Sequence, residues 1–288
     1  MGLQVDLGAS TWLWTSPFGT ADADALFAKI AGLGYQVVEI AVEDPDLIDV
    51  SAVRKALADH GLRGITCGAF SPTRDLTNDD ESLQRTGMEY IERCLDITNA
   101  IGAKFFAGPM YAAVGKARMV SAEQRKIEWQ RAVTNLRKAC DMAEARGLEL
   151  ALEPLNRFES DLINNVDDLL RLIEDIDHPA AKICLDMFHM NIEEPDPEQA
   201  IRRAGEKLIH VQVSENYRGT PGTGNASWDA YYRGLEAIGY RGAVSIESFT
   251  PQNKELAAAV CIWRDLAESQ DQFARDGYAF LKKWTANK

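Results

Sequence analysis

The 288-residue sequence predicts an α/β fold in which eight parallel strands close into one (β/α)8 barrel, the TIM barrel. Short apolar runs alternate with helical stretches along the whole chain, and such alternation indicates a parallel sheet with helices outside it. Similar glycine-containing phrases recur where the helical stretches end, and no Pro-rich or Ser-rich linker interrupts them. The recurrence favours a single domain over residues 1–288, which is an ordinary length for one barrel.

Four strand–helix units are expected in the first half of the chain. Their strands are short apolar runs, expected at residues 3–8, 37–41, 63–69 and 104–107. Their helices are expected at residues 21–33, 50–60, 81–101 and 122–146. Helices that follow short strands in this way are typical of βαβ units, which form parallel sheets.

Four further units are expected in the second half. Their strands lie near residues 149–153, 182–186, 208–213 and 243–247. Their helices lie near residues 166–175, 198–204, 228–238 and 254–284. Glycines that follow a helical run shortly before a strand are expected to end the helices; they are Gly32, Gly34, Gly61, Gly102, Gly147 and Gly239.

The main alternative fold is an open, doubly wound sheet. Its nucleotide-binding versions carry Gly-x-Gly-x-x-Gly after the first strand or a P-loop. This chain has neither motif in those places. The closed barrel is therefore the preferred prediction.

The composition excludes several classes of partner. The net charge is −13, so the chain lacks the basic face that nucleic acids and anionic membranes require. The five cysteines are scattered, which argues against a disulfide framework. No signal peptide is recognisable, and no segment approaches the roughly 20 apolar residues of a membrane span. We therefore expect a cytoplasmic protein whose partner is a small molecule.

Polar side chains lie at the ends of the last four expected strands. Glu153, Asp186 and Glu247 each end an apolar run, and His210 and Gln212 lie in the strand at 208–213. In a parallel barrel these strand ends meet at one rim, where active sites lie. An acid among apolar neighbours is unfavourable unless a cation neutralises it. Three carboxylates with one amide or imidazole therefore predict a divalent cation site.

The strand at 208–213 leaves the fourth ligand open. His210 and Gln212 are two residues apart, so their side chains point to the same side of the strand. Gln212 lies nearer the rim by roughly 6–7 Å, and its carbonyl oxygen suits a hard cation. We expect Gln212 as the ligand with His210 one layer deeper, and the reverse assignment is the alternative.

Several segments, in order over nearly the whole chain, carry a family resemblance. They are Gly68-Ala-Phe-Ser-Pro72, Asp75-Leu-Thr77, Arg93-Cys-Leu-Asp-Ile97, Gly102-Ala-Lys104, Gly108-Pro-Met-Tyr111, Leu152-Glu-Pro-Leu-Asn-Arg-Phe-Glu159, Leu185-Asp-Met-Phe-His-Met-Asn191, Ser214-Glu-Asn-Tyr-Arg-Gly219 and Ser245-Ile-Glu-Ser248. With these segments the chain resembles the sugar isomerases and epimerases of the xylose-isomerase-like barrels. Within that group it is most similar to the D-tagatose 3-epimerase and D-psicose (allulose) 3-epimerase branch.

The resemblance implies a metal-dependent ketose 3-epimerase or a closely related isomerase. Glu153, Asp186 and Glu247 would bind the ion, with Mn²⁺ expected and Mg²⁺ or Co²⁺ as alternatives. Glu153 and Glu247 would also be the acid–base pair, because on strands three apart they can approach a sugar from different sides. The cation would stabilise the enediolate that forms when a proton leaves the carbon beside the carbonyl group.

The resemblance further implies that Glu159, His189 and Arg218 hold substrate oxygens. No second basic residue accompanies Arg218 in its loop, which favours an unphosphorylated sugar. In the epimerase branch a His stands six residues before the equivalent Arg, whereas this chain has Gln212 there. Hydroxypyruvate isomerases look similar in using Gln at this place. A hydroxypyruvate-type isomerase, or an epimerase or lyase acting on 3-keto-glycosides, is therefore the alternative function.

The remaining expectations concern residues around the site and on the surface. Trp14, with Trp12 and Phe18, follows the first strand and is expected to wall the pocket against the sugar. Glu39 and Glu43 are expected to be solvated or structural. The long helices at 81–101 and 122–146 suggest a homo-oligomer, either a dimer or a tetramer.

Overall fold

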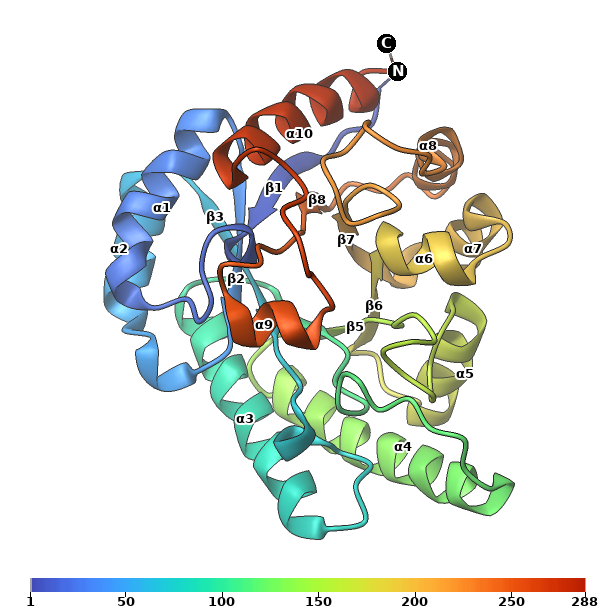
Figure 1. Cartoon of the computed structure of the whole chain (residues 1–288). Coiled ribbons are helices and arrows are strands. Elements are labelled where there is room, and N and C mark those ends of the chain that lie inside the picture. The colour runs from blue at the N-terminus through green and yellow to red at the C-terminus, as the bar shows by residue number, and fades with distance from the viewer. Residues whose placement is uncertain (1, 288) are drawn as a thin grey trace.

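The computed structural model describes residues 2–287 and shows one closed barrel of eight parallel strands in sequence order (Figure 1). Its strands are β1 (Asp6–Ser10), β2 (Val37–Val42), β3 (Arg63–Gly68), β4 (Phe105–Gly108), β5 (Glu149–Leu152), β6 (Ala181–Asp186), β7 (Leu208–Val213) and β8 (Ala243–Ile246). Strand β8 pairs with β1 and so closes the ring. The expected barrel is confirmed, and the open-sheet alternative is excluded.

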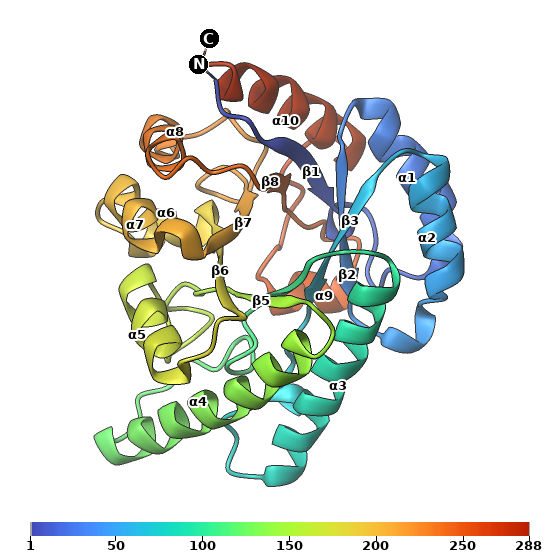
Figure 2. The ribbon, with the colours of Figure 1, turned by 180° about the vertical axis from the view of Figure 1, so that it is seen from behind.

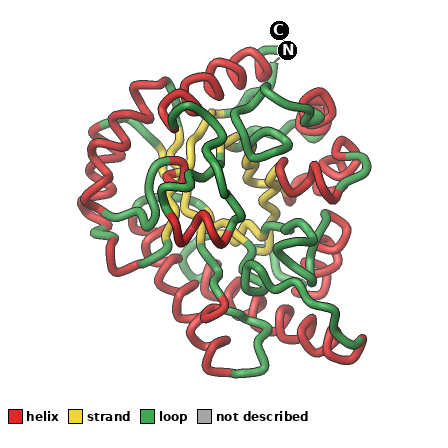
Figure 3. Tube along the Cα trace, in the orientation of Figure 1, coloured by secondary structure: helices red, strands yellow, loops and turns green. Residues whose placement is uncertain are grey.

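Most helices surround the barrel on its outer side, and the short helix α9 lies over one end of it (Figure 3). They are α1 (Thr20–Leu33), α2 (Val50–Asp59), α3 (Glu81–Ala100), α4 (Ala122–Glu144), α5 (Val166–Ile176), α6 (Met187–Glu193), α7 (Pro197–Ala204), α8 (Trp228–Ala237), α9 (Lys254–Ala259) and α10 (Gln270–Thr285). Short 3-10 turns lie at Thr11–Leu13, Pro45–Leu47, Pro72–Arg74 and Gly205–Lys207. Among the described residues, no helix combines the length and the apolar character that crossing a membrane requires.

Both ends of the described chain lie at the same place on the barrel (Figure 2). The amide of Leu3 donates to the carbonyl of Thr285 at 2.8 Å, which joins the start of the chain to the end of α10. Helix α10 thereby covers the junction at which β1 and β8 close the ring. Closure of the barrel thus depends on residues from the two extremes of the sequence.

Three expected elements differ from the structure. The helix expected at 254–284 is split, because Cys261 adopts a left-handed conformation (φ 58°) that ends α9, and Ser269 then caps a new helix, α10. Strand β1 begins at Asp6 rather than Leu3, because only the later residues pair with β2 and β8. Gly32 lies inside α1, and the helix ends instead at Gly34, whose φ is 104°.

Side chains alternate between the two faces of each strand, and the side chains on the two faces differ in size. Large apolar residues such as Ile40 and Val244 belong to the extensive core formed with the helices. A smaller cluster, which fills the barrel, contains small residues such as Ala41, Ala107 and Ala151. Small side chains at this level leave room inside the ring for polar groups near the carboxyl ends of the strands.

The tightest packing inside the ring lies where β1 meets β8. A Cβ atom on Gly8 would lie 2.4 Å from Oγ of Ser245 and 3.2 Å from Cβ of Val37. We expect Gly8→Ala to lower the free energy of unfolding by about 1–3 kcal/mol, because overpacking forces the strands apart. The shift should appear as a lower midpoint in urea unfolding.

The Gly8→Ala prediction has a matched compensating change. The hydroxyl of Ser245 is buried and has no hydrogen-bond partner among the described residues, so Ser245→Ala alone should leave stability nearly unchanged. Combined with Gly8→Ala, it removes the closest contact and should restore most of the loss. Equal instability of the single and double variants would contradict this account.

Candidate active site

The strand-end acids meet at one end of the barrel, as expected. Glu153 directly follows β5, Asp186 ends β6 and Glu247 directly follows β8, while Gln212 lies within β7. Asp186 pairs in register with Gln212, whereas Gln212 pairs with Ser245, so Glu247 lies two residues further along its strand direction. All four of these polar side chains are at most 6% exposed.

Arg218 lies between two of these acids. Its Nη1 contacts Oδ2 of Asp186, and its Nη2 donates to Oε2 of Glu247 at 2.9 Å. The guanidinium group also lies over the rings of Phe188, at 4.4 Å, and Phe249, at 5.0 Å. These contacts give Arg218 a fixed place in the cluster, although it comes from a long loop.

The loop that carries Arg218 is organised around Glu215. This carboxylate is fully buried and accepts hydrogen bonds from the amides of Asn216, Gly222 and Ala226 and from Nε1 of Trp228. Burial acts to raise the pKa of Glu215, but these hydrogen bonds outweigh it and lower the pKa. The sequence analysis missed this role, although an acid inside a Gly-rich loop was a usable signal.

His189 and Glu159 are held by one residue, Asn156. The Nδ1 atom of His189 accepts from the amide of Asn156 at 3.1 Å, which directs Nε2 towards Glu153 and Asp186, at 3.5 and 3.8 Å. The side-chain amide of Asn156 donates to Oε1 of Glu159 at 2.7 Å. Sequence reasoning identified His189 and Glu159 but not Asn156, which lies in the same phrase.

Burial and mutual repulsion govern the charges of the acids. The pKa of Glu153 is raised well above its usual value by burial and then by the charges of Glu247 and Asp186. The pKa of Glu247 is also raised well above its usual value, chiefly by burial. Burial acts to raise the pKa of Asp186 as well, but Arg218 and His189 outweigh it and lower the pKa. The surroundings of Glu153 and Glu247 therefore favour the protonated form, whereas those of Asp186 favour the ionised form.

The donor set fits a hard divalent cation. Ligand atoms of Glu153, Asp186 and His189 all lie within 4.8 Å of one another, and each of these residues is buried. Three buried carboxylates face one guanidinium group, so negative charge is in excess at the site. Carboxylate oxygens are the preferred ligands of Mn²⁺ and Mg²⁺.

Gln212 presents its nitrogen, not its oxygen, to the acids. Its Nε2 donates to Oε1 of Glu39 at 2.7 Å and to Oε1 of Glu247 at 2.8 Å, while its Oε1 accepts from Sγ of Cys184 at 3.3 Å. This orientation places both amide hydrogens of Gln212 on carboxyl oxygens, which accept them. Gln212 can offer an oxygen to a cation only if its carboxamide turns.

His210 lies below Gln212, as its position two residues earlier predicts. It is fully buried, and its Nε2 contacts Oε2 of Glu39. Glu39, on β2, is also fully buried, so the option that it is solvated is wrong. The strand pattern carried a signal, because Glu39 alternates with Val37 and Ala41, which both belong to buried clusters.

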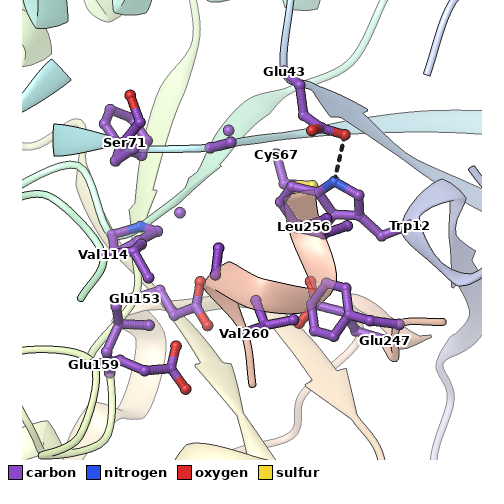
Figure 4. Close-up of a pocket in the computed structure, with 18 of the residues that line it drawn as sticks. Trp12, Glu43, Cys67, Ser71, Val114, Glu153, Glu159, Glu247, Leu256 and Val260 are labelled. Carbon is purple, nitrogen blue, oxygen red and sulfur yellow. Dashed lines mark hydrogen bonds between the residues drawn. The ribbon is translucent and has the colours of Figure 1, made fainter. Parts of the chain in front are cut away.

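A cavity of about 270 Å³ opens above the acids (Figure 4). Its wall includes Glu153, Glu159, His189, Arg218 and Glu247 from the cluster described above. In Figure 4, Trp12 and Glu43 lie apart from Glu153 and Glu159 and are joined by a 2.9 Å hydrogen bond between Nε1 of Trp12 and Oε1 of Glu43. The volume is near the lower end of the range for ligand pockets, roughly 300–1,000 Å³, and suits one small molecule.

The expected role of Trp14 is not found in the structure. Trp12, and not Trp14, lines the cavity. Nε1 of Trp14 donates to Oδ1 of Asp271 at 2.8 Å, which draws the indole towards the start of α10. The sequence placed both tryptophans after β1 but gave no means of telling which would face the cavity.

Helix α9 forms part of the cavity wall that the sequence did not predict. Leu256, Ala259 and Val260 line the cavity together with Glu255 (Figure 4). These residues come from the segment that was expected to be the start of one long outer helix. The break at Cys261 is what allows this short helix to lie across the barrel end instead.

Comparison with known proteins identifies the family. The model of the family described as xylose isomerase-like TIM barrel matches residues 27–283. A ketose 3-epimerase of Arthrobacter globiformis is 31% identical over 98% of this chain and 98% of its own length. An L-ribulose 3-epimerase of a Methylomonas species is 29% identical over 97% and 98%.

Solved structures agree with this assignment. A structure of L-ribulose 3-epimerase superposes with a TM-score of 0.93 at 30% identity and covers 98% of this chain and 95% of that one. A D-allulose 3-epimerase from Methylomonas superposes with a TM-score of 0.92 at 28% identity over 99% and 100%. The chain is therefore an enzyme of the xylose isomerase-like TIM barrel family.

Proposed function

We propose that this enzyme is a metal-dependent ketose 3-epimerase that acts on a small unphosphorylated sugar. The observation that carries the proposal is a pair of buried carboxyl groups, Glu153 and Glu247, which line one cavity and both have a raised pKa. Relatives named as 3-epimerases match nearly the full length of the chain and support the same chemistry.

The acid–base pair is arranged for inversion at carbon. Strands β6 and β7 separate the strands that carry Glu153 and Glu247, so the two groups approach a bound sugar from different sides. One carboxylate takes the C3 proton of the ketose and the other carboxyl group returns a proton to the opposite face. Burial raises the pKa of both Glu153 and Glu247, which makes each a stronger base than an exposed carboxylate.

The other residues bind and orient the sugar. Arg218, His189 and Glu159 line the cavity and offer donors and acceptors for hydroxyl and carbonyl oxygens. The carboxylates of Glu153, Asp186 and Glu247 would hold the cation, with Gln212 as the further ligand if its carboxamide turns. A divalent ion bound there would polarise the carbonyl group of the sugar and make its neighbouring C–H bond more acidic.

Gln212 also favours the alternative reaction. If the enzyme is a hydroxypyruvate-type isomerase, or an epimerase or lyase of 3-keto-glycosides, the same acids would act on a different carbon. The cavity of about 270 Å³ suits a single sugar better than a glycoside with a bulky second group.

We also propose that the enzyme works in the cytoplasm as a homo-oligomer. Four of the five cysteines are buried and all five are free, which suits a reducing compartment. Two apolar side chains, Met119 and Phe158, are strongly exposed on neighbouring loops that pair through Lys116 and Ser160. An exposed apolar pair of this kind favours contact with a second copy.

The reaction is tested by isotope exchange. The protein is incubated with Mn²⁺ and a panel of ketopentoses and ketohexoses in D₂O, and the deuterated carbon is located by NMR. We expect deuterium at C3. Deuterium at C1 or C2 would establish aldose–ketose isomerisation instead. If the metal-loaded protein exchanges deuterium into none of the sugars, both reactions are rejected.

The roles of the two acids can be separated. We expect Glu153→Gln and Glu247→Gln each to lower the rate of epimerisation by about 10²–10⁴-fold, because each variant lacks one proton-transfer group. Each variant should still exchange deuterium into the one epimer whose C3 proton faces the remaining acid. If both variants lose epimerisation but do not exchange deuterium into opposite epimers, the two acids do not act from opposite sides of the sugar.

Removal of the cation should lower stability. Metal is first removed from the protein with a chelator. Adding Mn²⁺ back at about 100 times its dissociation constant should then stabilise the fold by about 2.7 kcal/mol and raise Tm by about 5–10 °C. Asp186→Asn should abolish this shift in differential scanning fluorimetry. Asp161→Asn, which removes an acid paired with Arg118 and Arg125 outside the cavity, should retain it.

The cavity should discriminate against phosphorylated sugars. Glu43, Glu153, Glu159, Glu247 and Glu255 line it, whereas Arg218 is the one Arg or Lys among the lining residues. Like charges placed together at a binding surface cost several kcal/mol. We therefore expect kcat/KM for a ketose phosphate to be at least about 100-fold below that for the free ketose. Comparable values for the two substrates would overturn this prediction.

A further inference from the structure

Beneath the acid–base pair lies a buried chain of polar contacts that the proposed reaction does not use. It runs from His210 to Glu39, from Glu39 to Gln212 and from Gln212 to Glu247. All four side chains are at most 3% exposed. The chain joins strand β2 to strands β7 and β8 through the interior of the barrel.

Glu247 is fixed by two donors, one on each of its oxygens. Arg218 donates to Oε2 at 2.9 Å, and Gln212 donates to Oε1 at 2.8 Å. Arg218 is also a candidate to bind the substrate, so its contact with Glu247 is open to exchange when a sugar arrives. In the orientation that Gln212 adopts, both of its amide hydrogens are engaged with carboxyl oxygens, so its hydrogen bond holds Glu247 independently of Arg218.

The orientation of Gln212 depends in turn on Glu39. Both amide hydrogens of Gln212 are used, one on Glu39 at 2.7 Å and one on Glu247. If the carboxamide turned over, its oxygen would face two carboxylate oxygens at this short range, which is strongly unfavourable. Glu39 therefore keeps the nitrogen of Gln212 directed at the acids.

His210 completes the arrangement by fixing Glu39. Its Nε2 contacts Oε2 of Glu39, which leaves Oε1 for Gln212. Nδ1 of His210 has no partner among the described residues, so Glu39 is the group that orients the ring through a hydrogen bond. Each oxygen of Glu39 thus has a polar partner on β7, and a buried carboxylate held on both oxygens is restricted in its motion.

From this geometry we propose that Glu39 is a positioning residue for Glu247, acting through the carboxamide of Gln212. The inference rests on the proposed function, in which Glu247 transfers a proton and binds the cation. It gives Gln212 a task as a hydrogen-bond donor that does not require it to be a metal ligand. Outer partners that orient metal-binding or catalytic groups contribute about 10- to 100-fold to affinity or activity.

A double-mutant cycle tests the proposal. Glu39→Gln removes the negative charge and one of the two acceptor oxygens, and Gln212→Met keeps the volume of the side chain but removes both donors. We expect each single variant to lower kcat and to weaken Mn²⁺ binding, measured by calorimetry without substrate, by about 10- to 100-fold. Because Glu39 acts through Gln212, the double variant should be no worse than Gln212→Met alone.

The controls separate positioning from general stability. Thr66→Val removes a fully buried hydroxyl on β3 that contacts Oγ1 of Thr98 on α3 at 2.6 Å, and so faces the helices rather than the acids. It should lower Tm but leave kcat and Mn²⁺ affinity unchanged. If Glu39→Gln does not fold, Glu39→Asp retains the charge but retracts the carboxylate by one methylene group, and the same cycle applies.

The outcomes are distinct. An active wild type together with a Glu39→Gln variant of unchanged kcat and Mn²⁺ affinity overturns the inference alone. Losses that multiply in the double variant also overturn it, because Glu39 would then act independently of Gln212. A wild type that neither binds Mn²⁺ nor converts a ketose defeats the proposed function, and the inference with it.

Discussion

The concentration of buried carboxylates at one end of the barrel is the constraint on which the rest of the structure depends. Glu153, Asp186 and Glu247 lie at the rim and Glu39 lies below them within β2, each nearly or fully removed from solvent. Charges in such surroundings are tolerated only with partners that neutralise or hydrogen-bond them. Arg218 supplies the guanidinium contact, and a bound cation would supply the remainder. The excess of negative charge thus opposes folding and is the basis of the proposed metal binding.

Neutralising the charge of the acids is not enough for the proposed reaction, because the acids must also differ in pKa. Arg218 and His189 lower the pKa of Asp186, whereas burial and repulsion raise the pKa of Glu153 and of Glu247. In the proposed reaction all three acids hold the cation, and the two with a raised pKa also exchange protons. Their separation by two strands places the exchanging pair on different sides of the cavity, which is the geometry that inversion requires.

Much of the site was predictable because its residues follow the strand pattern. Glu153, Asp186 and Glu247 each end an apolar run, and parallel strands bring such ends together whatever the details of the loops. The roles that depend on loops and on side-chain direction were not predictable in this way. Trp14 turns to Asp271, and α9 lies across the cavity because Cys261 breaks the expected helix. Glu39 sits in the middle of a strand rather than at its end, so a search of strand ends passed over it.

The sequence by itself determined the closed barrel, the positions of most of its strands and the identity of the acids at the rim. Periodicity and composition are local properties, and they suffice to fix these features. Only the tertiary structure decided which end of the Gln212 carboxamide faces the acids and which tryptophan lines the cavity. It alone also decided that Glu39 on β2 reaches His210 and Gln212 on β7. These outcomes depend on contacts between residues up to 257 positions apart, as between Trp14 and Asp271, and such contacts exist only once the ring has closed.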